Sequence, residues 1–198
     1  MKRGVLMIVS GPSGSGKGTI VKQLENDDNI KVSVSATTRK PRAGEEHGVH
    51  YYFMEKYEFL NRVDDGEMLE YNEYCGNHYG TPLMGVEPFL KEGKDVILEI
   101  DVNGARQISK IMKCVKLFIL PPNVKVLKER LCLRGTETEE VLNIRLNQAH
   151  VEMEQAYNYD YLVVNDNIDD AVNKVKSILI AERHRAFNMK DKLDELLK

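Results

Sequence analysis

Short apolar runs alternate with amphipathic segments along this chain of 198 residues. Five runs rich in β-branched residues predict strands that are buried on both faces of a sheet, at residues 5–10, 31–35, 96–100, 115–120 and 161–165. The segments between them have helical spacing, most clearly at residues 168–179, where Asn167 is the predicted N-cap. Strands that alternate with helices predict an α/β fold with a parallel central sheet and crossover helices.

One stretch interrupts this alternation. From residue 35 to residue 93 the apolar positions follow a period of two, tyrosines are frequent, and Gly76 and Gly80 mark turns, which predicts a small antiparallel or mixed sheet. We therefore expect a core domain of residues 1–34 and 94–198 and an inserted lobe of residues 35–93. The polar stretch at residues 134–140 is a second candidate insertion, and the charged tail predicts a terminal helix.

Composition and charge narrow the range of functions. The hydrophobic share of 42% and the charged share of 30% are typical of a globular protein. A net charge of −3 argues against nucleic-acid binding, which needs a basic face. The longest apolar run, residues 5–9, is far shorter than the roughly 20 residues that span a membrane. The three scattered cysteines form no paired motif, which favours a reducing cytoplasm.

A glycine-rich segment follows the first predicted strand and leads into a predicted helix. It reads Gly11-Pro12-Ser13-Gly14-Ser15-Gly16-Lys17-Gly18-Thr19. Glycines let successive backbone N–H groups turn toward a phosphate, the helix N-terminus adds partial positive charge, and Lys17 adds a full charge. Gly18 stands where the usual motif has a hydroxyl that contacts Mg²⁺. We therefore expect Thr19 to bind a phosphate oxygen and Mg²⁺ to be held largely by water and nucleotide.

The inserted lobe contains a second candidate site for an anion. Arg39 and Arg42 lie three residues apart on a turn that contains Pro41, and paired guanidinium groups suit a phosphate dianion. Tyr51 and Tyr79 are phenolic donors for the same phosphate. Taken singly, these residues are equally compatible with surface arginines and with tyrosines that pack a small sheet.

Five separated motifs together resemble the guanylate kinase family, in order, from about residue 4 to residue 180. They are the phosphate loop, residues 35–45, residues 76–80, residues 97–101 and residues 134–140. The resemblance implies a three-layer phosphate-loop kinase fold with a GMP-binding lobe and a short lid at about residues 134–147 of the core. It also implies transfer of the γ-phosphoryl group of ATP to GMP, and to dGMP, in purine nucleotide metabolism, with Mg²⁺ accompanying ATP.

The resemblance implies a role for each matched residue of the lobe. The residues that would hold the GMP phosphate are Arg39, Arg42, Tyr51 and Tyr79. The residues that would read the guanine are Ser35, Glu70, Thr81 and Asp101. The chemistry of the base agrees, because a buried carboxylate accepts from both N1–H and the exocyclic amino group of guanine, whereas adenine has a bare acceptor at N1. The hydroxyls of Ser35 and Thr81 are predicted donors to guanine O6.

On the ATP side, the resemblance implies that Arg130, Arg134 and Arg145 close over the phosphates. Asn165, at the end of a predicted strand, is assigned either to adenine or to the start of the next helix. Glu99 and Asp101 lie two residues apart at a strand end, where such sheets bind ligands, and with Thr19 they are candidates for the outer shell of Mg²⁺.

The implied reaction needs no general base, because the acceptor is already an anionic phosphate oxygen. It needs alignment and positive charge, which we assign to Lys17, Arg39, Arg134 and Arg145. Two alternatives stay open: a non-catalytic protein-binding module of the same shape, and a kinase for another monophosphate or a phosphosugar. The complete phosphate loop argues against the first, and assays with other monophosphates separate the second.

Overall fold

The predicted parallel sheet is present, with strand order β2-β7-β1-β8-β9. It is seen in a computed structural model that describes residues 3–42, 44–74, 76–132 and 139–198. The strands are β1 (Leu6–Ser10), β2 (Ile30–Val32), β7 (Asp95–Glu99), β8 (Val115–Leu120) and β9 (Tyr161–Val164). Every pairing between them is parallel, so their carboxyl ends lie along one edge of the sheet.

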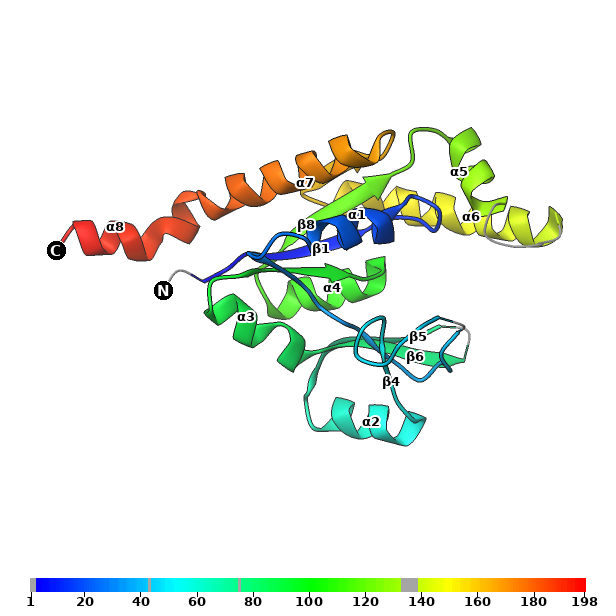
Figure 1. Ribbon diagram of the computed structural model, residues 1–198, viewed down its shortest axis with the longest axis horizontal. Helices are drawn as coiled ribbons and strands as arrows, with labels where there is room; N and C mark the ends of the chain where they lie inside the picture. The colour runs from blue at the N-terminus through cyan, green and yellow to red at the C-terminus, as the bar shows by residue number, and fades with distance from the viewer. Residues whose placement is uncertain (1–2, 43, 75, 133–138) are drawn as a thin grey trace.

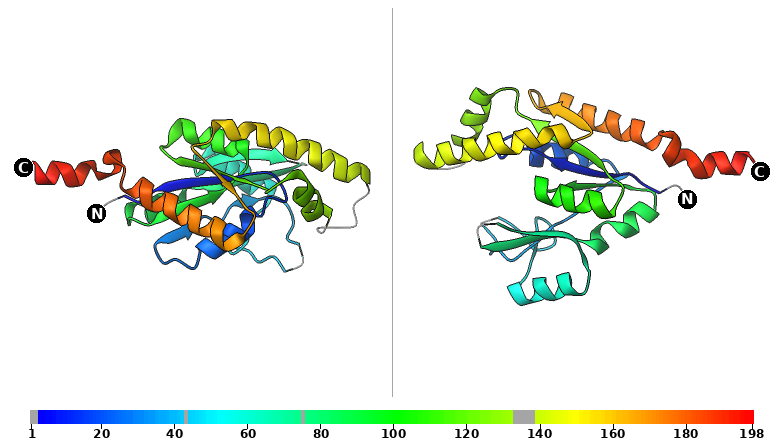
Figure 2. Two further views of the ribbon diagram at one scale, coloured as in Figure 1. Left: turned by 90° about the horizontal axis from the view of Figure 1, so that it is seen from above. Right: turned by 180° about the vertical axis from the view of Figure 1, so that it is seen from behind.

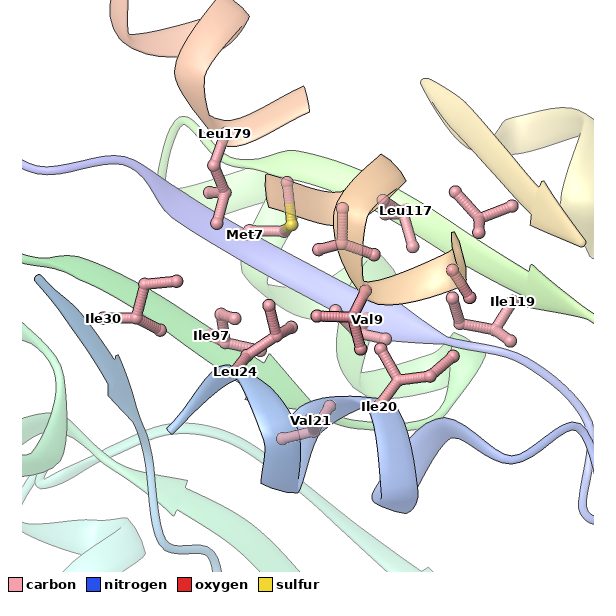
Figure 3. Close-up of a cluster of buried hydrophobic side chains, with 14 of the residues drawn as sticks. Met7, Val9, Ile20, Val21, Leu24, Ile30, Ile97, Leu117, Ile119 and Leu179 are labelled. Atoms are coloured by element: carbon pink, nitrogen blue, oxygen red, sulfur yellow. The ribbon is translucent and has the colours of Figure 1, made fainter. Parts of the chain in front are cut away.

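Helices cover both faces of this sheet and give three layers (Figure 1). Met7 and Val9 of β1 pack toward α1 (Lys17–Leu24) and α7 (Ile168–Arg183), as Figure 3 shows. Leu6 and Ile8 face the other side and pack in a second buried cluster. That cluster includes residues of α3 (Glu87–Lys91) and α4 (Val102–Ile111). Alternate residues of one strand therefore enter two different cores.

Strand β9 departs from the prediction that every strand is buried on both faces. Val163 is buried against α7, but the side chains on the other face, Leu162 and Val164, are 52% and 44% exposed. The reason is position, because β9 is an edge strand of the sheet and only its Val163 face is covered.

The predictions for the helices near the end of the chain hold. Asn167 caps α7, with its side-chain oxygen accepting from the Asp170 N–H at 3.1 Å. The tail forms the short turn η3 (Ala186–Met189) and α8 (Lys190–Leu196), which extends away from the sheet in Figure 1. Within the described ranges, no helix is long and apolar enough to cross a bilayer.

Two further helices, α5 (Val124–Cys132) and α6 (Glu139–Glu154), pack against each other through a small apolar cluster. Leu127 and Leu131 of α5 are buried there with Leu142 and Ala149 of α6. A turn, η2 (Gln155–Asn158), links α6 to β9. Residues 134–138 of the predicted lid lie outside the described residues.

A second, mixed sheet forms the lobe, with strand order β4-β3-β6-β5. Its strands are β3 (Ala36–Thr37), β4 (Tyr52–Phe53), β5 (Met68–Tyr74) and β6 (Asn77–Pro82). Helix α2 (Lys56–Asp64) packs on it, and a turn, η1 (Leu83–Gly85), leads to α3. This sheet lies apart from α5 and α6 in Figure 1 and in the right-hand view of Figure 2. It falls within residues 35–93; the division into domains stays a prediction.

Candidate active site

The glycine-rich loop lies at the carboxyl end of the central strand β1 and leads directly into α1. Gly14 and Gly16 have φ angles of 85° and 88°, a left-handed conformation that side chains with a Cβ rarely adopt. Helix α1 begins at Lys17, and no side chain caps it. Its first N–H groups are therefore available to an anion at the positive end of the helix.

The Lys17 side chain folds back onto the start of this loop. Its ammonium group donates to the carbonyl oxygens of Gly11 and, at 3.2 Å, of Pro12. Glu99, at the end of the neighbouring strand β7, also faces the first turn of α1. A Cβ added at Gly18 would lie 3.7 Å from both of its carboxylate oxygens. Thr19 is exposed on the same turn. The predicted loop residues are thus brought together with Glu99.

Asn165 contacts the loop backbone from the end of β9. It is 1% exposed, and its side-chain amide donates to the carbonyl oxygen of Ser15 at 2.8 Å. The helix-start role that the sequence left open belongs to Asn167 instead. Arg130 of α5 reaches the same carbonyl oxygen, at 3.4 Å, and the backbone oxygen of Asn165, at 3.2 Å. Both predicted ATP-site residues therefore contact the phosphate loop.

Helices α5 and α6 also pack on the loop. A Cβ added at Gly14 would lie 3.0–3.3 Å from Leu127 and Leu131 of α5. Arg145 of α6 donates to the Ser13 hydroxyl at 3.0 Å. The sequence did not identify the two leucines as part of the site, since their spacing only indicates a helix core. Arg134 lies outside the described residues, so its assignment stays a prediction.

Three of the four predicted acceptor-phosphate residues gather on the lobe. The guanidinium carbon of Arg39 lies 5.5 Å from the centre of the Tyr51 ring, and the Tyr51 and Tyr79 rings are 6.2 Å apart. Burial raises the pKa of Tyr51, and the nearby Glu99 carboxylate adds to this. The Tyr51 phenol therefore stays a protonated donor near neutral pH. The fourth residue, Arg42, has an exposed side chain on the same turn.

Glu45 is a member of this cluster to which the sequence gave no role. Its two oxygens accept from Nη2 and Nη1 of Arg39, at 2.9 Å each, and one of them also accepts from the Arg42 N–H at 2.7 Å. These bonds hold the pKa of Glu45 down at about 2. The sequence gives one signal of the contact between Glu45 and Arg39: an acidic residue three positions after the arginine pair.

Of the predicted base-reading residues, Glu70 and Thr81 are buried and Asp101 is exposed, in a polar group where the lobe meets α4. Glu70 of β5 is 6% exposed and accepts a hydrogen bond of 2.7 Å from the Thr81 hydroxyl of β6. Burial raises the pKa of Glu70 to about 7; the Thr81 bond opposes this rise and the Asp101 carboxylate adds to it. The Thr81 proton is thus directed at Glu70 rather than left free for guanine O6.

Asp101 lies between the two sheets and is held on both carboxylate oxygens. One oxygen caps α4 by accepting from the Gly104 N–H at 2.8 Å, and the other accepts from the Asn72 side chain at 3.1 Å. A Cβ at Gly104 would lie 2.6 Å from a Glu70 carboxylate oxygen, so only glycine fits there. Ser35 is half-buried, and its backbone oxygen accepts from the Tyr52 N–H. Asn72 and Gly104 are residues of this group that the sequence did not reveal.

The metal side of the site has a sparse donor set. Across the described ranges, no three histidine, cysteine or acidic side chains converge in a way that would hold an ion. Asp101 already accepts hydrogen bonds from Gly104 and Asn72, and the Glu99 carboxylate faces the first turn of α1. This arrangement fits a Mg²⁺ ion that keeps most of its water and nucleotide ligands.

A phosphate loop at the end of a central parallel strand, joined to a second polar site on an inserted mixed sheet, defines the class of phosphate-loop nucleotide kinases. The family model described as guanylate kinase matches residues 3–182, and the chain belongs to the guanylate kinase family.

Individual relatives agree with this assignment. The guanylate kinase of Clostridium perfringens (strain SM101 / Type A) is 51% identical over 98% of this chain and 90% of that protein. That of Clostridium tetani (strain Massachusetts / E88) is 48% identical, over 98% of this chain and 93% of that protein. The crystal structure of guanylate kinase from Anaplasma phagocytophilum aligns with a TM-score of 0.78 at 34% identity, covering 93% of this chain and 89% of that one. The chain is a nucleoside monophosphate kinase with the phosphate-loop kinase fold.

Proposed function

We propose that this guanylate kinase transfers the γ-phosphoryl group of ATP to GMP, and to dGMP, with ATP on the phosphate loop and GMP in the lobe. The observation that carries this assignment is the buried Glu70 carboxylate held by Thr81, within a lobe that also presents Arg39, Tyr51 and Tyr79. A nucleoside monophosphate site needs two elements: a hydrogen-bond acceptor for the edge of the base and a cationic group for the phosphate.

The base is selected through Glu70 and Asp101. An ionised carboxylate accepts from guanine N1–H and from the exocyclic amino group, whereas adenine N1 would face it lone pair to lone pair. Because a site that leaves buried polar groups unpaired rejects the wrong ligand by about 10⁴-fold, this contact suffices to exclude AMP. Ser35 is the predicted donor to guanine O6. No residue of the site is assigned to the 2′-hydroxyl, which is why dGMP is expected to be accepted.

The transfer itself relies on position and positive charge. The acceptor is an anionic phosphate oxygen, so no side chain has to remove a proton from it. Lys17 would contact the outer ATP phosphates, Arg39 and Arg42 would fix the acceptor, and Arg134 and Arg145 would bring charge from the lid side. We assign Asn165 to the adenine end of ATP because it lies beside the phosphate loop. Mg²⁺, with Glu99 holding its waters, would neutralise charge on the ATP phosphates.

Hydrolysis of ATP competes with the transfer, so water has to be kept from the γ-phosphate. Closure of the lid and of the lobe over the two nucleotides supplies this exclusion. ATP and GMP are intracellular solutes, which agrees with the cytoplasmic location expected from the cysteines.

The test is a steady-state assay with ATP and GMP, dGMP, AMP or UMP as acceptors, following ADP release and identifying the diphosphate product. We expect kcat/KM for GMP to exceed that for AMP by about three to four orders of magnitude. Equal values for AMP and GMP would overturn the roles of Glu70 and Asp101. Lack of turnover with every acceptor would favour the protein-binding module.

A further inference from the structure

Arg39 is held by more contacts than a surface arginine usually makes. Its side chain and that of Glu45 are only 16% and 19% exposed. Nη1 donates to Glu45 at 2.9 Å and to the Lys40 carbonyl oxygen at 2.8 Å, and Nη2 donates to Glu45 at 2.9 Å. The aromatic rings of Tyr51 and Phe53 lie 5.5 and 5.9 Å from its guanidinium carbon. These contacts therefore fix the orientation of the Arg39 guanidinium group before a nucleotide binds.

Counting donors shows which edge of Arg39 these contacts leave. A guanidinium group has five N–H donors in a fixed plane. Glu45 and the Lys40 carbonyl use both N–H groups of Nη1 and one of Nη2. The N–H groups that these two partners leave are on Nε and Nη2, along one side of the plane, and their spacing suits two phosphate oxygens. The Tyr79 side chain also forms a hydrogen bond with this guanidinium group and raises its pKa, after the larger effect of Glu45.

We propose that Glu45 is a positioning residue for the acceptor nucleotide: it holds Arg39 so that the Nε and Nη2 edge faces the GMP phosphate. This inference rests on the proposed function, because it takes Arg39 to be a ligand of that phosphate. Glu45 itself makes no contact with the nucleotide. It removes the rotamer freedom of Arg39 in advance, so binding no longer has to order that side chain.

The sign of the effect separates positioning from simple electrostatics. Glu45 is negative, so by Coulomb's law alone its removal would make the cluster more positive and tighten GMP binding. Loss of a positioning contact acts in the opposite direction and weakens GMP binding. Loss of the Glu45 charge and loss of the Arg39 orientation therefore predict opposite changes in the Kd for GMP in the same variant.

The experiment compares Glu45→Gln with the matched control Glu46→Gln, which makes the same charge change at the adjacent, exposed position. Dissociation constants for GMP and for guanosine, which lacks the phosphate, are measured by calorimetry or competition. We expect Glu45→Gln to raise the Kd for GMP about tenfold, while the Kd for guanosine and the KM for ATP stay unchanged. Glu46→Gln is expected to match the parent chain in all three quantities.

Each other outcome decides against the proposal. An unchanged or lower Kd for GMP in Glu45→Gln would show that Glu45 is neutral or competes for Arg39. A parallel loss of guanosine binding would show a general structural role instead. The variant Arg39→Met distinguishes an error in the proposed acceptor site from an error in the positioning role of Glu45. If it leaves the Kd for GMP unchanged, the acceptor site itself is misassigned. If it weakens GMP but Glu45→Gln does not, only the positioning role of Glu45 fails.

Discussion

The raised pKa of Glu70 makes the affinity for GMP depend on pH. Burial raises this pKa to about 7, so near neutral pH the free protein holds a mixture of carboxylate and carboxylic acid. Only the carboxylate can accept from both guanine N–H groups. GMP should therefore bind to the ionised fraction, and its apparent affinity should rise as the pH increases through 7.

The size of the effect follows from the ionised fraction. With a pKa of about 7, about nine tenths of the carboxyl groups are ionised at pH 8 and about one tenth at pH 6. Because the apparent dissociation constant is the intrinsic one divided by the competent fraction, GMP should bind about tenfold more weakly at pH 6 than at pH 8. The second ionisation of the GMP phosphate, near pH 6, adds a factor of about two.

Glu70→Gln separates these two contributions, because glutamine has nearly the same shape and does not titrate in this range. Calorimetric titration with GMP from pH 6 to pH 8 is the assay, in the parent chain and in the variant. We expect a change of about twentyfold in the parent chain and of about twofold in the variant, which also binds GMP more weakly throughout. Parallel pH profiles for the two proteins would refute the reasoning.

The same carboxyl group affects stability with a defined sign. Its pKa is higher in the folded chain, about 7, than the ordinary value of 4.5 that applies when it is unfolded. Between these values the folded state binds more protons, so stability falls as the pH rises through this window. The shift corresponds to about 3 kcal/mol lost by pH 8. Urea unfolding of Glu70→Gln should lack this decrease, and an equal decrease in the variant would assign it to other groups.

Three further substitutions test other parts of the account. Lys17→Ala should lower kcat about a hundredfold to a thousandfold while the Kd for GMP is unchanged, and a large loss of GMP binding would contradict the division into two sites. Arg42→Ala should raise the KM for GMP about tenfold without raising that for ATP; equal effects on both substrates would argue against a separate acceptor site. Asn167→Ala should cost about 1 kcal/mol in urea unfolding, because it removes the cap of α7, whereas the exposed mid-helix Asn173→Ala should not; equal losses would reject the cap.

Local signals in the sequence predicted the elements well. The glycine spacing of the phosphate loop reflects φ angles that only glycine adopts readily, as Gly14 and Gly16 show. The cap of α7 follows from the hydrogen-bonding chemistry of Asn167 within three residues. Such features depend on neighbours in the chain, so one sequence is enough to predict them.

Contacts between distant segments could not be predicted in this way. The Asn165 amide meets the Ser15 carbonyl across 150 positions of sequence, and Leu127 reaches Gly14 only once α5 has packed on the loop. The exposed face of β9 has the same cause, because composition indicates a strand but not its place at the edge of the sheet. The pairing of Glu45 with Arg39 lies within one loop, yet no periodic pattern marks it.

A crystal structure of the protein with GMP tests the two-site account most directly. We predict that the nucleotide phosphate lies against Arg39 and Arg42, with Tyr51 and Tyr79 beside it, and that the guanine edge faces Glu70. GMP bound instead at the phosphate loop, against Lys17, or with its base turned away from Glu70, would contradict the account.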